Sequence, residues 1–485
     1  MFVSNYRKIK SLSLILKNNV HFVSIFHVLN LWLIIKFLHP KQYKGKNKVN
    51  PTELALRHFD NFYGKIYEKQ WQSIRLGLLS PKKYAAIVNN FVDFESTEIE
   101  LRQIGAYNLR YIYDKNLRKI IKQLKREEFI QSRKLMVKNN NNDESIIIPS
   151  ELEQTESETE NIEAFFTDVQ ESELEHNQAS LHLDLSQFVP VTELKYREEI
   201  VDDREYFEFY NTNHELNVDH IEQTNIEMPI LLNLYLFRRN DFTQFPAAKL
   251  CQTNLFNYYL LDGASILPVL AMDIQNGDYV ADFCAAPGGK SLLMYLQMKN
   301  CKFFLNELSE SRFERLKNVF RSFIPKDKIK QSIIFSNSDA IHLRQYNKFD
   351  KILVDVPCTN DRHSIYSNEN NIFSPKRMNE RISIPNKQLD LLCEALKSIK
   401  INGMVVYSTC SLSPIQNDGV IHMALKRMND EQPLMKFAII NLKQSLRPLR
   451  TMFQFDFQFK YGIQILPNIC TNFGPMYFSK IQRLA

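Results

Sequence analysis

From about residue 254 onward, short apolar runs alternate with amphipathic segments. Short apolar runs are typical of buried strands, and apolar residues that recur every three or four positions are typical of helices. Their alternation predicts an α/β fold with a mostly parallel sheet covered on both faces. The strand candidates are residues 279–284, 302–305, 332–335, 351–356 and 404–407, with a late edge strand at 462–466; the helix candidates are 292–298, 313–320, 388–399 and 415–428.

The preceding region shows a helical pattern. Apolar residues recur at intervals of three to five across 51–90, and a second helical stretch covers 106–138. Residues 101–138 carry eleven Lys or Arg against three acidic residues. A basic helix is more often a solvated face than a nucleic-acid contact. We therefore interpret 51–138 as a helical N-terminal extension with no dedicated binding role.

The first fifty residues have the composition of a targeting segment. Nine Lys or Arg and no Asp or Glu precede Glu53. A basic, acid-free leader predicts an organelle transit peptide at 1–50. A membrane anchor is the alternative, because 20–35 is an uncharged apolar run of sixteen residues. That run is shorter than the roughly 20 residues needed to cross a bilayer, so we expect no stable membrane insertion.

An acidic segment interrupts the chain. Residues 143–175 contain twelve Asp or Glu and no Lys or Arg. Such a composition buries too little apolar surface to offset the entropy lost on ordering. We predict a disordered acidic insertion at 139–241, of which the part nearest 241 is ambiguous, followed by a catalytic domain at 242–485. The net charge of +6 permits a polyanionic partner without requiring one.

The seven cysteines indicate neither disulfides nor metal. Their number is odd, no two form a C-x-x-C pair, and no Cys/His cluster has the spacing of zinc ligands. We expect no bound metal and a reducing compartment, so each cysteine must be explained singly.

One loop has the features of a cofactor site. The first strand candidate runs into Asp282-Phe-Cys-Ala-Ala-Pro-Gly-Gly-Lys290, where Gly288 and Gly289 let a ligand approach the backbone and a helix N-terminus follows. Glu307 ends the next strand and suits a ribose diol, and Asp339 after the third suits an adenine amino group. Neither the phosphate loop of ATP-binding proteins nor G-x-G-x-x-G is present, which disfavours ATP and NAD.

Two cysteines end the fourth and fifth strands, in Asp355-Val-Pro-Cys358 and Ser408-Thr-Cys410-Ser411. A cysteine taken alone is most often a small buried apolar residue. Two at adjacent strand ends, on the rim where the cofactor loop lies, indicate nucleophilic chemistry instead.

These motifs resemble the Sun-domain family of RNA cytosine-5 methyltransferases, most closely its mitochondrial ribosomal-RNA branch. The motifs that carry the resemblance are CAAPGGK at 284–290, VDVPC at 354–358 and STCS at 408–411, supported by segments at 58–84, 258–270 and 472–484. The resemblance implies a Rossmann-like methyltransferase fold that uses S-adenosylmethionine. It also implies mitochondrial rRNA as substrate and a helical-repeat partner of the mitochondrial termination-factor family. With the predicted leader at 1–50 read as a mitochondrial transit peptide, it implies location in the mitochondrial matrix.

The same resemblance assigns roles to residues. Cys410 corresponds to the nucleophile, Cys358 to the cysteine that assists product release, and Asp355 to the contact with the base, near Lys290. A thiolate that adds to carbon 6 of cytosine makes carbon 5 nucleophilic, which explains why a thiol is needed. The residues that would hold the cofactor are Cys284, Ala285, Ala286, Pro287, Gly288, Gly289, Lys290, Glu307, Arg312, Asp339, Ala340 and Asp355.

Some positions depart from the family pattern. Glu307 stands where the branch tends to have Asp, and Ala340 where it often has Gly, which leaves the adenine contact open. Arg362, His363, Lys376, Arg377 and Arg381 could line an RNA groove or form an ordinary solvated loop. The alternatives to rRNA methylation are tRNA methylation and a non-catalytic role in mitochondrial ribosome assembly.

Overall fold

The computed structural model describes residues 50–139, 216, 218–297 and 300–485. The predicted transit peptide, apart from Asn50, lies outside the described residues. The same holds for 140–215, which include the acidic stretch of the predicted insertion.

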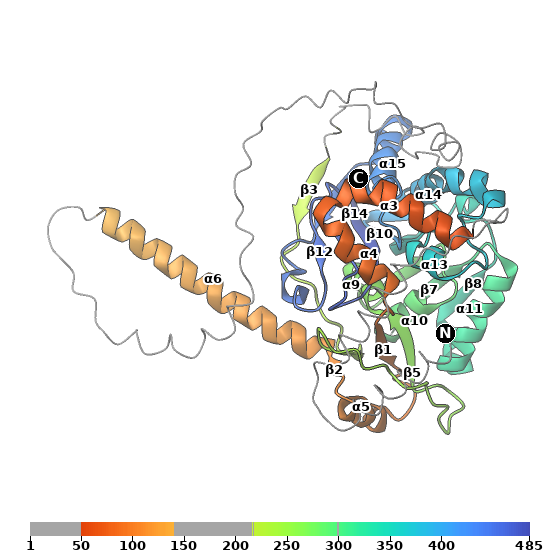
Figure 1. Ribbon diagram of the computed structural model, residues 1–485, viewed down its shortest axis with the longest axis horizontal. Helices are drawn as coiled ribbons and strands as arrows, with labels where there is room; N and C mark the ends of the chain where they lie inside the picture. Colours follow the sequence, from red (N-terminus) through yellow and green to blue (C-terminus); the bar gives the residue numbers. More distant parts are fainter. Residues whose placement is uncertain (1–49, 140–215, 217, 298–299) are drawn as a thin grey trace, which may run out of the picture. The chain divides into compact units, whose positions relative to one another are not determined.

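A ten-stranded mixed sheet forms the centre of the catalytic part (Figure 1). Its parallel half has the order β10-β9-β6-β7-β8, and antiparallel strands complete the other side of β10. The parallel strands are β6 (Tyr279–Asp282), β7 (Lys302–Asn306), β8 (Ile333–Ser336), β9 (Phe349–Asp355) and β10 (Ile399–Thr409). Every strand predicted in this half is confirmed, with small shifts at the ends.

The antiparallel side of the sheet was largely missed by the apolar pattern. Strand β14 (Met476–Arg483) pairs with β10 along one edge and with β13 and β11 along the other. The predicted strand at 462–466 is β13, but it lies between β14 and β12 rather than at the edge. The other strands are β11 (Phe437–Asn441), β12 (Phe455–Asp456), β13 (Ile463–Ile465) and β3 (Asp219–Glu222), which pairs with β11.

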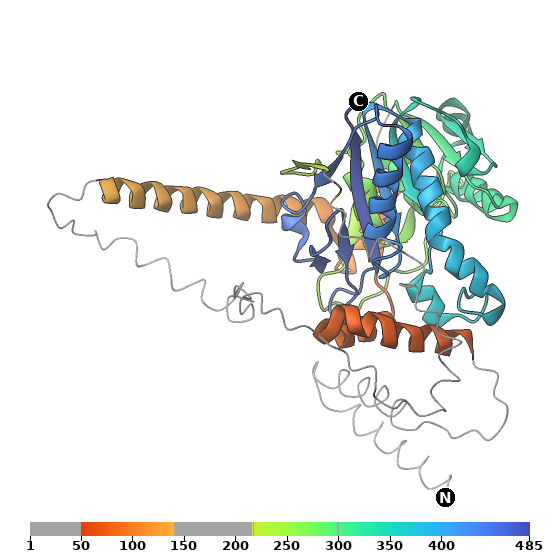
Figure 2. The same ribbon diagram turned by 90° about the horizontal axis from the view of Figure 1, so that it is seen from above.

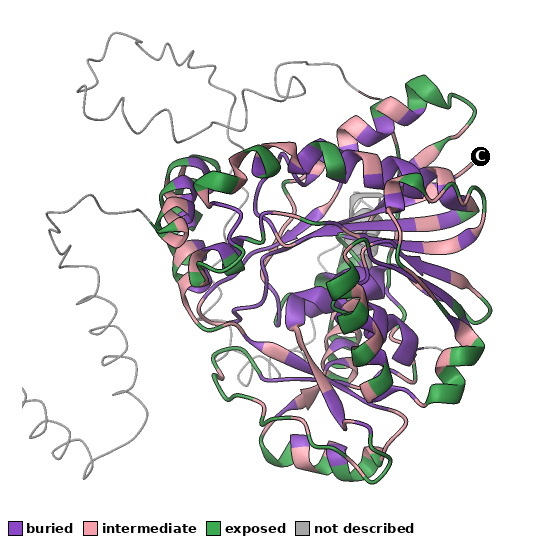
Figure 3. Cartoon of the chain, turned by 90° about the vertical axis from the view of Figure 1, so that its right-hand side faces the viewer, coloured by how far each residue is buried: buried purple, intermediate pink, exposed green. Residues whose placement is uncertain are grey.

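Helices cover both faces of the sheet, as predicted. Alternate residues of one strand enter different cores: Val280 lies in the core beneath α9, α10 and α11, whereas Ala281 lies in the core beneath α14 and α15. Figure 3 shows the strands of the sheet largely buried between these helices. The helices are α9 (Ile266–Ala271), α10 (Gly289–Gln297), α11 (Glu310–Phe323), α12 (Lys326–Ser332), α13 (Asp361–Tyr366), α14 (Met378–Ser398) and α15 (Asp418–Glu431).

The N-terminal extension differs from its prediction, because it is not purely helical. Its strands β1 (Tyr84–Val88) and β2 (Tyr107–Asn108) join β4 (Leu234–Leu236) and β5 (Tyr258–Asp262) in an antiparallel sheet of order β2-β4-β1-β5. Strands β3 and β4 also show that the predicted insertion contains regular strands before the expected boundary at 241. The boundaries predicted at 138 and 241 therefore do not separate structural domains.

The helices of this extension pack against the catalytic part. Helices α3 (Pro51–Tyr67) and α4 (Trp71–Leu79) contact α13 and share a core with Ile384, Leu412 and Ile415 (Figure 2). The remaining helices are α5 (Phe94–Gln103) and α6 (Leu109–Asn139). Within the described ranges, every helix is too short or too polar to cross a membrane.

Candidate active site

Both predicted cysteines lie at the carboxyl ends of neighbouring parallel strands. Cys358 follows β9 and Cys410 follows β10, and the two strands pair in register up to Asp355 and Ser408. The sulfur atoms of Cys358 and Cys410 lie 3.0 Å apart as free thiols. The structure therefore places side by side two thiols that are separated by 52 positions in the chain.

Asp355 connects these thiols to the cofactor loop. One carboxylate oxygen accepts a hydrogen bond of 2.8 Å from Lys290 Nζ, and the other accepts one of 2.8 Å from Ser408 Oγ. Burial opposes the charge of Lys290, but the Asp355 carboxylate outweighs burial and raises the Lys290 pKa. Lys290 therefore remains a cation; it lies in the first turn of α10 and faces Asp355.

The electrostatics of Cys410 keep its sulfur protonated when no substrate is bound. The hydrogen bond with Cys358, burial and the Asp355 carboxylate each raise the Cys410 pKa, and only Lys290 lowers it among these influences. A thiolate at Cys410 would therefore form only as its proton is transferred. Cys358 Sγ is within reach of that proton.

Glu307 offers the acceptor that a ribose diol requires. Its side chain is 3% exposed; Oε1 accepts a hydrogen bond of 3.1 Å from Ser309 N, but Oε2 is buried without a partner among the described residues. A buried carboxylate oxygen without a donor is costly, so this site suits a ligand that brings a hydroxyl group. Arg312 Nη1 lies 3.5 Å from Glu307 Oε1, and its Nη2 donates to Ala286 O at 2.7 Å.

The cofactor loop is held mainly by its own backbone and by Asp282. Ala285 N donates to Asn306 O at 2.8 Å, and Asp282 accepts hydrogen bonds from Ser291 Oγ at 2.6 Å and from Cys284 N at 3.2 Å. Burial raises the pKa of Asp282 to about 7. Asp282, which the sequence did not single out as a site residue, thus fixes both ends of the turn that contains Cys284, Ala285, Ala286, Pro287, Gly288 and Gly289.

Packing of neighbouring side chains requires glycine at both positions of the cofactor loop. Gly288 adopts φ +114°, which a side chain rarely tolerates, and a Cβ there would lie 3.1 Å from Leu316. A Cβ on Gly289 would lie 2.8 Å from Leu261 Cδ1. Protein side chains lie where a Cβ on either glycine would point, so packing requires both glycines, and approach of a ligand to their backbone stays a prediction.

Asp339 has one oxygen committed to the backbone. Asp339 Oδ1 accepts a hydrogen bond of 3.1 Å from Ile341 N and caps the short 3-10 helix Ala340–His342. Ala340 is 3% exposed and belongs to the core beneath α14. Ala340 therefore acts as a packing residue in the structure, and an adenine contact by Asp339 stays a prediction.

A buried carboxylate that the sequence did not reveal joins the two cysteine loops. Asp361, three positions after Cys358, is 0% exposed. It accepts hydrogen bonds from Thr359 Oγ1 at 2.5 Å and from Leu412 N at 2.7 Å. Tyr63 of α3 donates a third, at 2.8 Å. Since Thr359 follows Cys358 and Leu412 follows Cys410 closely, Asp361 fixes both loops to the N-terminal helix.

The predicted RNA-facing arginines are mostly used inside the protein. Arg362 is buried and donates to the carbonyls of Gly77 and Gly474 at 3.1 and 2.8 Å. Arg381 is buried over the Phe373 ring. The suggestion that Arg362 and Arg381 line an RNA groove is therefore wrong, because their guanidinium groups are occupied in packing.

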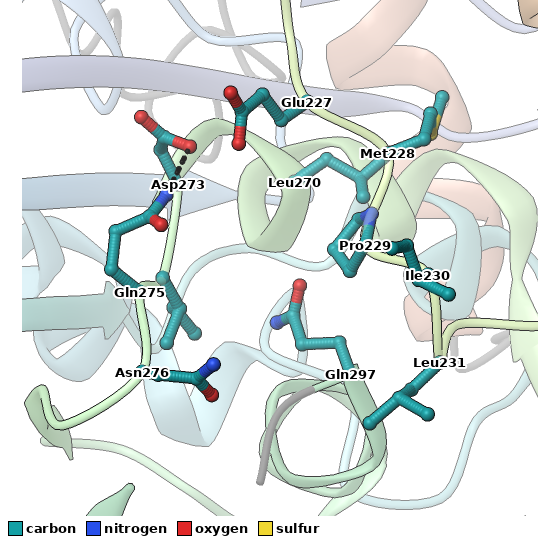
Figure 4. Close-up of a pocket in the computed structure, with 11 residues that line it drawn as sticks. Glu227, Met228, Pro229, Ile230, Leu231, Leu270, Asp273, Gln275, Asn276 and Gln297 are labelled. Atoms are coloured by element: carbon teal, nitrogen blue, oxygen red, sulfur yellow. Dashed lines mark hydrogen bonds between the residues drawn. The ribbon is translucent and has the colours of Figure 1, made fainter.

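A separate cavity lies away from the cysteines. It has a volume of about 430 Å³ and is lined by residues 227–231 and 273–276 together with Leu270 and Gln297. Figure 4 shows the Gln297 amide directed into it, and Gln297 Nε2 has no hydrogen-bond partner among the described residues. None of the predicted site residues lines this cavity.

The fold and the site together define a class of enzyme. A parallel β8-β7-β6-β9-β10 sheet, a loop after β6 and an acidic residue after β7 form a nucleoside site at the carboxyl edge. These features are those of a Rossmann-like S-adenosylmethionine-dependent methyltransferase, and the unpartnered Glu307 Oε2 fits the ribose of that cofactor.

Comparison with known proteins identifies the family. A family model described as 16S rRNA methyltransferase RsmB/F matches residues 269–481. The 5-cytosine rRNA methyltransferase nsun-4 of Caenorhabditis elegans is 31% identical over 479 residues, covering 93% of this chain and 96% of the relative. NSUN4 of Mus musculus is 32% identical, covering 92% and 94%. The chain belongs to the RsmB/F family of RNA cytosine-5 methyltransferases, which use S-adenosylmethionine.

Two further similarities are more distant. The mitochondrial tRNA (cytosine(34)-C(5))-methyltransferase of Mus musculus is 34% identical over 263 residues, which cover 53% of this chain and 71% of the relative. A solved methyltransferase homologue from Pyrococcus horikoshii aligns with a TM-score of 0.47 at 15% identity, covering 90% of this chain and 99% of that structure.

Proposed function

We propose that this enzyme methylates carbon 5 of a cytosine in mitochondrial small-subunit rRNA, through a covalent bond between Cys410 and carbon 6 of the base. The observation that carries the mechanism is the 3.0 Å contact between the sulfurs of Cys410 and Cys358 beside the Lys290–Asp355 pair. S-adenosylmethionine supplies the methyl group when it is bound next to these residues.

The residues divide the reaction into steps. Cys410 gives its proton to solvent as its sulfur bonds to carbon 6, which places an electron pair at carbon 5. Carbon 5 then takes the methyl group of S-adenosylmethionine, which leaves as S-adenosylhomocysteine. Asp355 and Lys290 stabilise the altered ring at its N3 edge. Removal of the carbon 5 proton then expels the Cys410 thiolate and restores the ring, and Cys358 is the acid/base group in reach of that sulfur.

The cofactor would be held by the loop from Cys284 to Lys290, Glu307, Arg312 and Asp339, with Asp355 facing both cofactor and base. Glu307 is the member with direct support, because its Oε2 is buried and unpartnered among the described residues. Asp282 and Arg312 keep the loop in place through the contacts already described.

Ribosomal RNA is a better substrate assignment than tRNA. The rRNA methyltransferases named nsun-4 or NSUN4 align over 90% or more of this chain, whereas the mitochondrial tRNA enzymes align over about half of it. The relatives named as mitochondrial, together with the basic leader, support the mitochondrial matrix as the location. A helical-repeat partner of the termination-factor family is part of the same proposal and rests on the family resemblance.

Crosslinking tests the covalent step. Full-length protein incubated with S-adenosylmethionine and an rRNA fragment containing 5-azacytosine should form an adduct whose peptide maps to Cys410. Cys410→Ala should form none, while retaining cofactor affinity and thermal stability. Mapping to another residue would reject the assignment of the nucleophile, and full activity of Cys410→Ala would favour a non-catalytic assembly factor.

Cys358→Ala separates attack from release. If Cys358 serves only to free the product, this variant should accumulate an RNA–protein adduct with unmodified RNA, visible on denaturing gels. Cys393→Ala is the matched control, because Cys393 is buried in the core beneath α14. Absence of an adduct with the Cys358 variant would remove that role.

Bisulfite sequencing of organelle RNA tests the substrate. Depletion of the enzyme should lower methylation at a cytosine of small-subunit rRNA and leave tRNA signals unchanged. Loss of a tRNA signal instead would identify tRNA as the substrate.

A further inference from the structure

A second surface has the chemistry of a nucleic-acid site. A groove of about 390 Å³ lies between α6, the residues after β4 and the loop at 451–452. We call it the basic groove; its principal lining residues are Tyr107, Tyr111, Lys115, Lys119, Arg238 and Arg239. Four of these are cations, two are aromatic, and no Asp or Glu lines the groove.

The sequence of α6 builds one wall. Tyr111, Lys115 and Lys119 are spaced by four positions and so lie along one face of the helix. The opposite side of α6 is anchored: Tyr113 is buried and its hydroxyl accepts from Ile226 N at 3.1 Å. Asn116 Nδ2 donates to Pro448 O at 2.8 Å. The basic face is therefore held in place at this end of α6.

The other wall comes from the end of β4. Arg238 lies 3.9 Å above the centre of the Tyr107 ring, on the strand that pairs with β4. This contact fixes a guanidinium group over an aromatic face, and Arg239 extends the positive charge beside it.

The groove's charges are available for a ligand. Lys115, Lys119 and Arg239 are exposed and form no ion pair within the part of the chain that the structure describes. Tyr111 is 60% exposed. Exposed cations beside an exposed aromatic ring suit a single strand of nucleic acid, whose phosphates need cations and whose unstacked bases need flat partners.

Hydrogen bonds connect the groove to the catalytic loops. Lys83 Nζ donates to Arg238 O at 2.7 Å, and Lys83 N donates to Asn472 O at 3.1 Å. Asn472 Oδ1 in turn accepts from Arg362 Nη2 at 2.8 Å. Arg362 belongs to α13, which begins three residues after Cys358. The groove is thus built on the same framework as the thiol site.

We propose that the basic groove binds single-stranded RNA that flanks the target cytosine. Lys115, Lys119 and Arg239 contact phosphates, and Tyr111 stacks on a base. This inference rests on the proposed function, since it assumes an RNA substrate, and it replaces the interpretation of α6 as a merely solvated face.

Binding of a labelled oligouridine to the full-length protein tests the proposal. Replacing Lys115, Lys119 and Arg239 together with Gln should weaken binding roughly 50-fold near 0.15 M salt and reduce the slope of log K against log salt by about 2. Tyr111→Ala should weaken binding about fivefold or more, and Tyr111→Phe should restore it. On saturating rRNA fragment, kcat should stay near wild type while KM rises.

The matched control removes three charges elsewhere. Lys326, Lys328 and Lys330 are exposed on α12, and their combined change to Gln should leave affinity within about twofold. Equal losses in both triple variants, or a neutral Tyr111→Ala, would overturn the proposal. Binding of polyglutamate with the same dependence on Tyr111 would overturn it too, in favour of an acidic protein.

The two proposals can fail separately. If the wild-type protein methylates no RNA, the proposed function is wrong. If it methylates RNA and the groove variants bind RNA normally, only the proposed role of the basic groove is wrong.

Discussion

The contact between Tyr63 and Asp361 predicts that the N-terminal helix controls catalysis. Tyr63→Phe removes one hydrogen bond of 2.8 Å to a fully buried carboxylate and leaves those from Thr359, Leu412 and Ser411. A hydrogen bond to a charged group contributes about 1.5–3 kcal/mol. Because three other donors remain, we expect the free energy of unfolding to fall by about 2 kcal/mol.

Catalysis should change as well, because Asp361 holds the loops that follow both cysteines. Loss of one anchor lets these loops shift, and small misplacements of reacting groups reduce rates by up to about 100-fold. We expect kcat of Tyr63→Phe to fall roughly tenfold, and that of Asp361→Asn further, with the KM for S-adenosylmethionine unchanged.

Tyr67→Phe is the matched control. Tyr67 lies one turn later on α3 and donates to Leu412 O at 2.9 Å, so its loss removes a bond to a neutral group worth about 1 kcal/mol. Urea denaturation and single-turnover methylation should be measured for both variants. Equal kcat values for wild type and Tyr63→Phe would refute the positioning role.

Three further changes probe the cofactor side. Glu307→Gln should weaken S-adenosylmethionine binding about tenfold in calorimetric titrations, because a carboxylate accepts more strongly than an amide; an unchanged Kd would remove Glu307 from the site. Asp282 has a folded pKa of about 7 against an ordinary value of 3.8, so the folded state retains a proton that the unfolded state loses. The free energy of unfolding should therefore fall by roughly 4 kcal/mol as pH rises from about 4 to above 7, and Asp282→Asn should flatten that decline in urea titrations. A pH profile identical to wild type would contradict this. Gly289→Ala places a Cβ 2.8 Å from Leu261 and 3.0 Å from Tyr259. This overpacking should lower the free energy of unfolding by about 1–3 kcal/mol in thermal denaturation. An unchanged Tm would show that the loop accommodates the methyl group without loss of stability.

The parallel half of the sheet was predictable because its strands are buried on both faces and read as apolar runs. Strand β14 was not, because it contains Ser479 and Lys480, which are buried through hydrogen bonds to Tyr461 O and Gln223 Oε1. Strand β1 was assigned to a helix, because the spacing of apolar residues before it continues a helical pattern. Pairing with β5, about 170 residues away, overrides that local preference.

The candidate site, like the fold, was only partly predictable from the sequence. Cys358 and Cys410 were predictable as neighbours, because parallel strands end at a common edge. Asp361 was not, since its partner Tyr63 lies 298 positions away and only tertiary packing brings the two together. Arg362 resembled an RNA contact because arginines are usually exposed. In the structure it is buried, and backbone carbonyls accept the hydrogen bonds of its guanidinium group.

Strand β14 has a consequence for biosynthesis. It covers the edge of β10, the strand that leads into Cys410, and it is the neighbour of β10 on that side of the described sheet. Until residues 476–483 have been made, an apolar strand edge stays unpaired and open to association with other chains. A premature stop before Met476 should therefore yield an aggregating polypeptide, rather than a weakened enzyme, and chaperones would have to shield the nascent sheet until translation has passed that point.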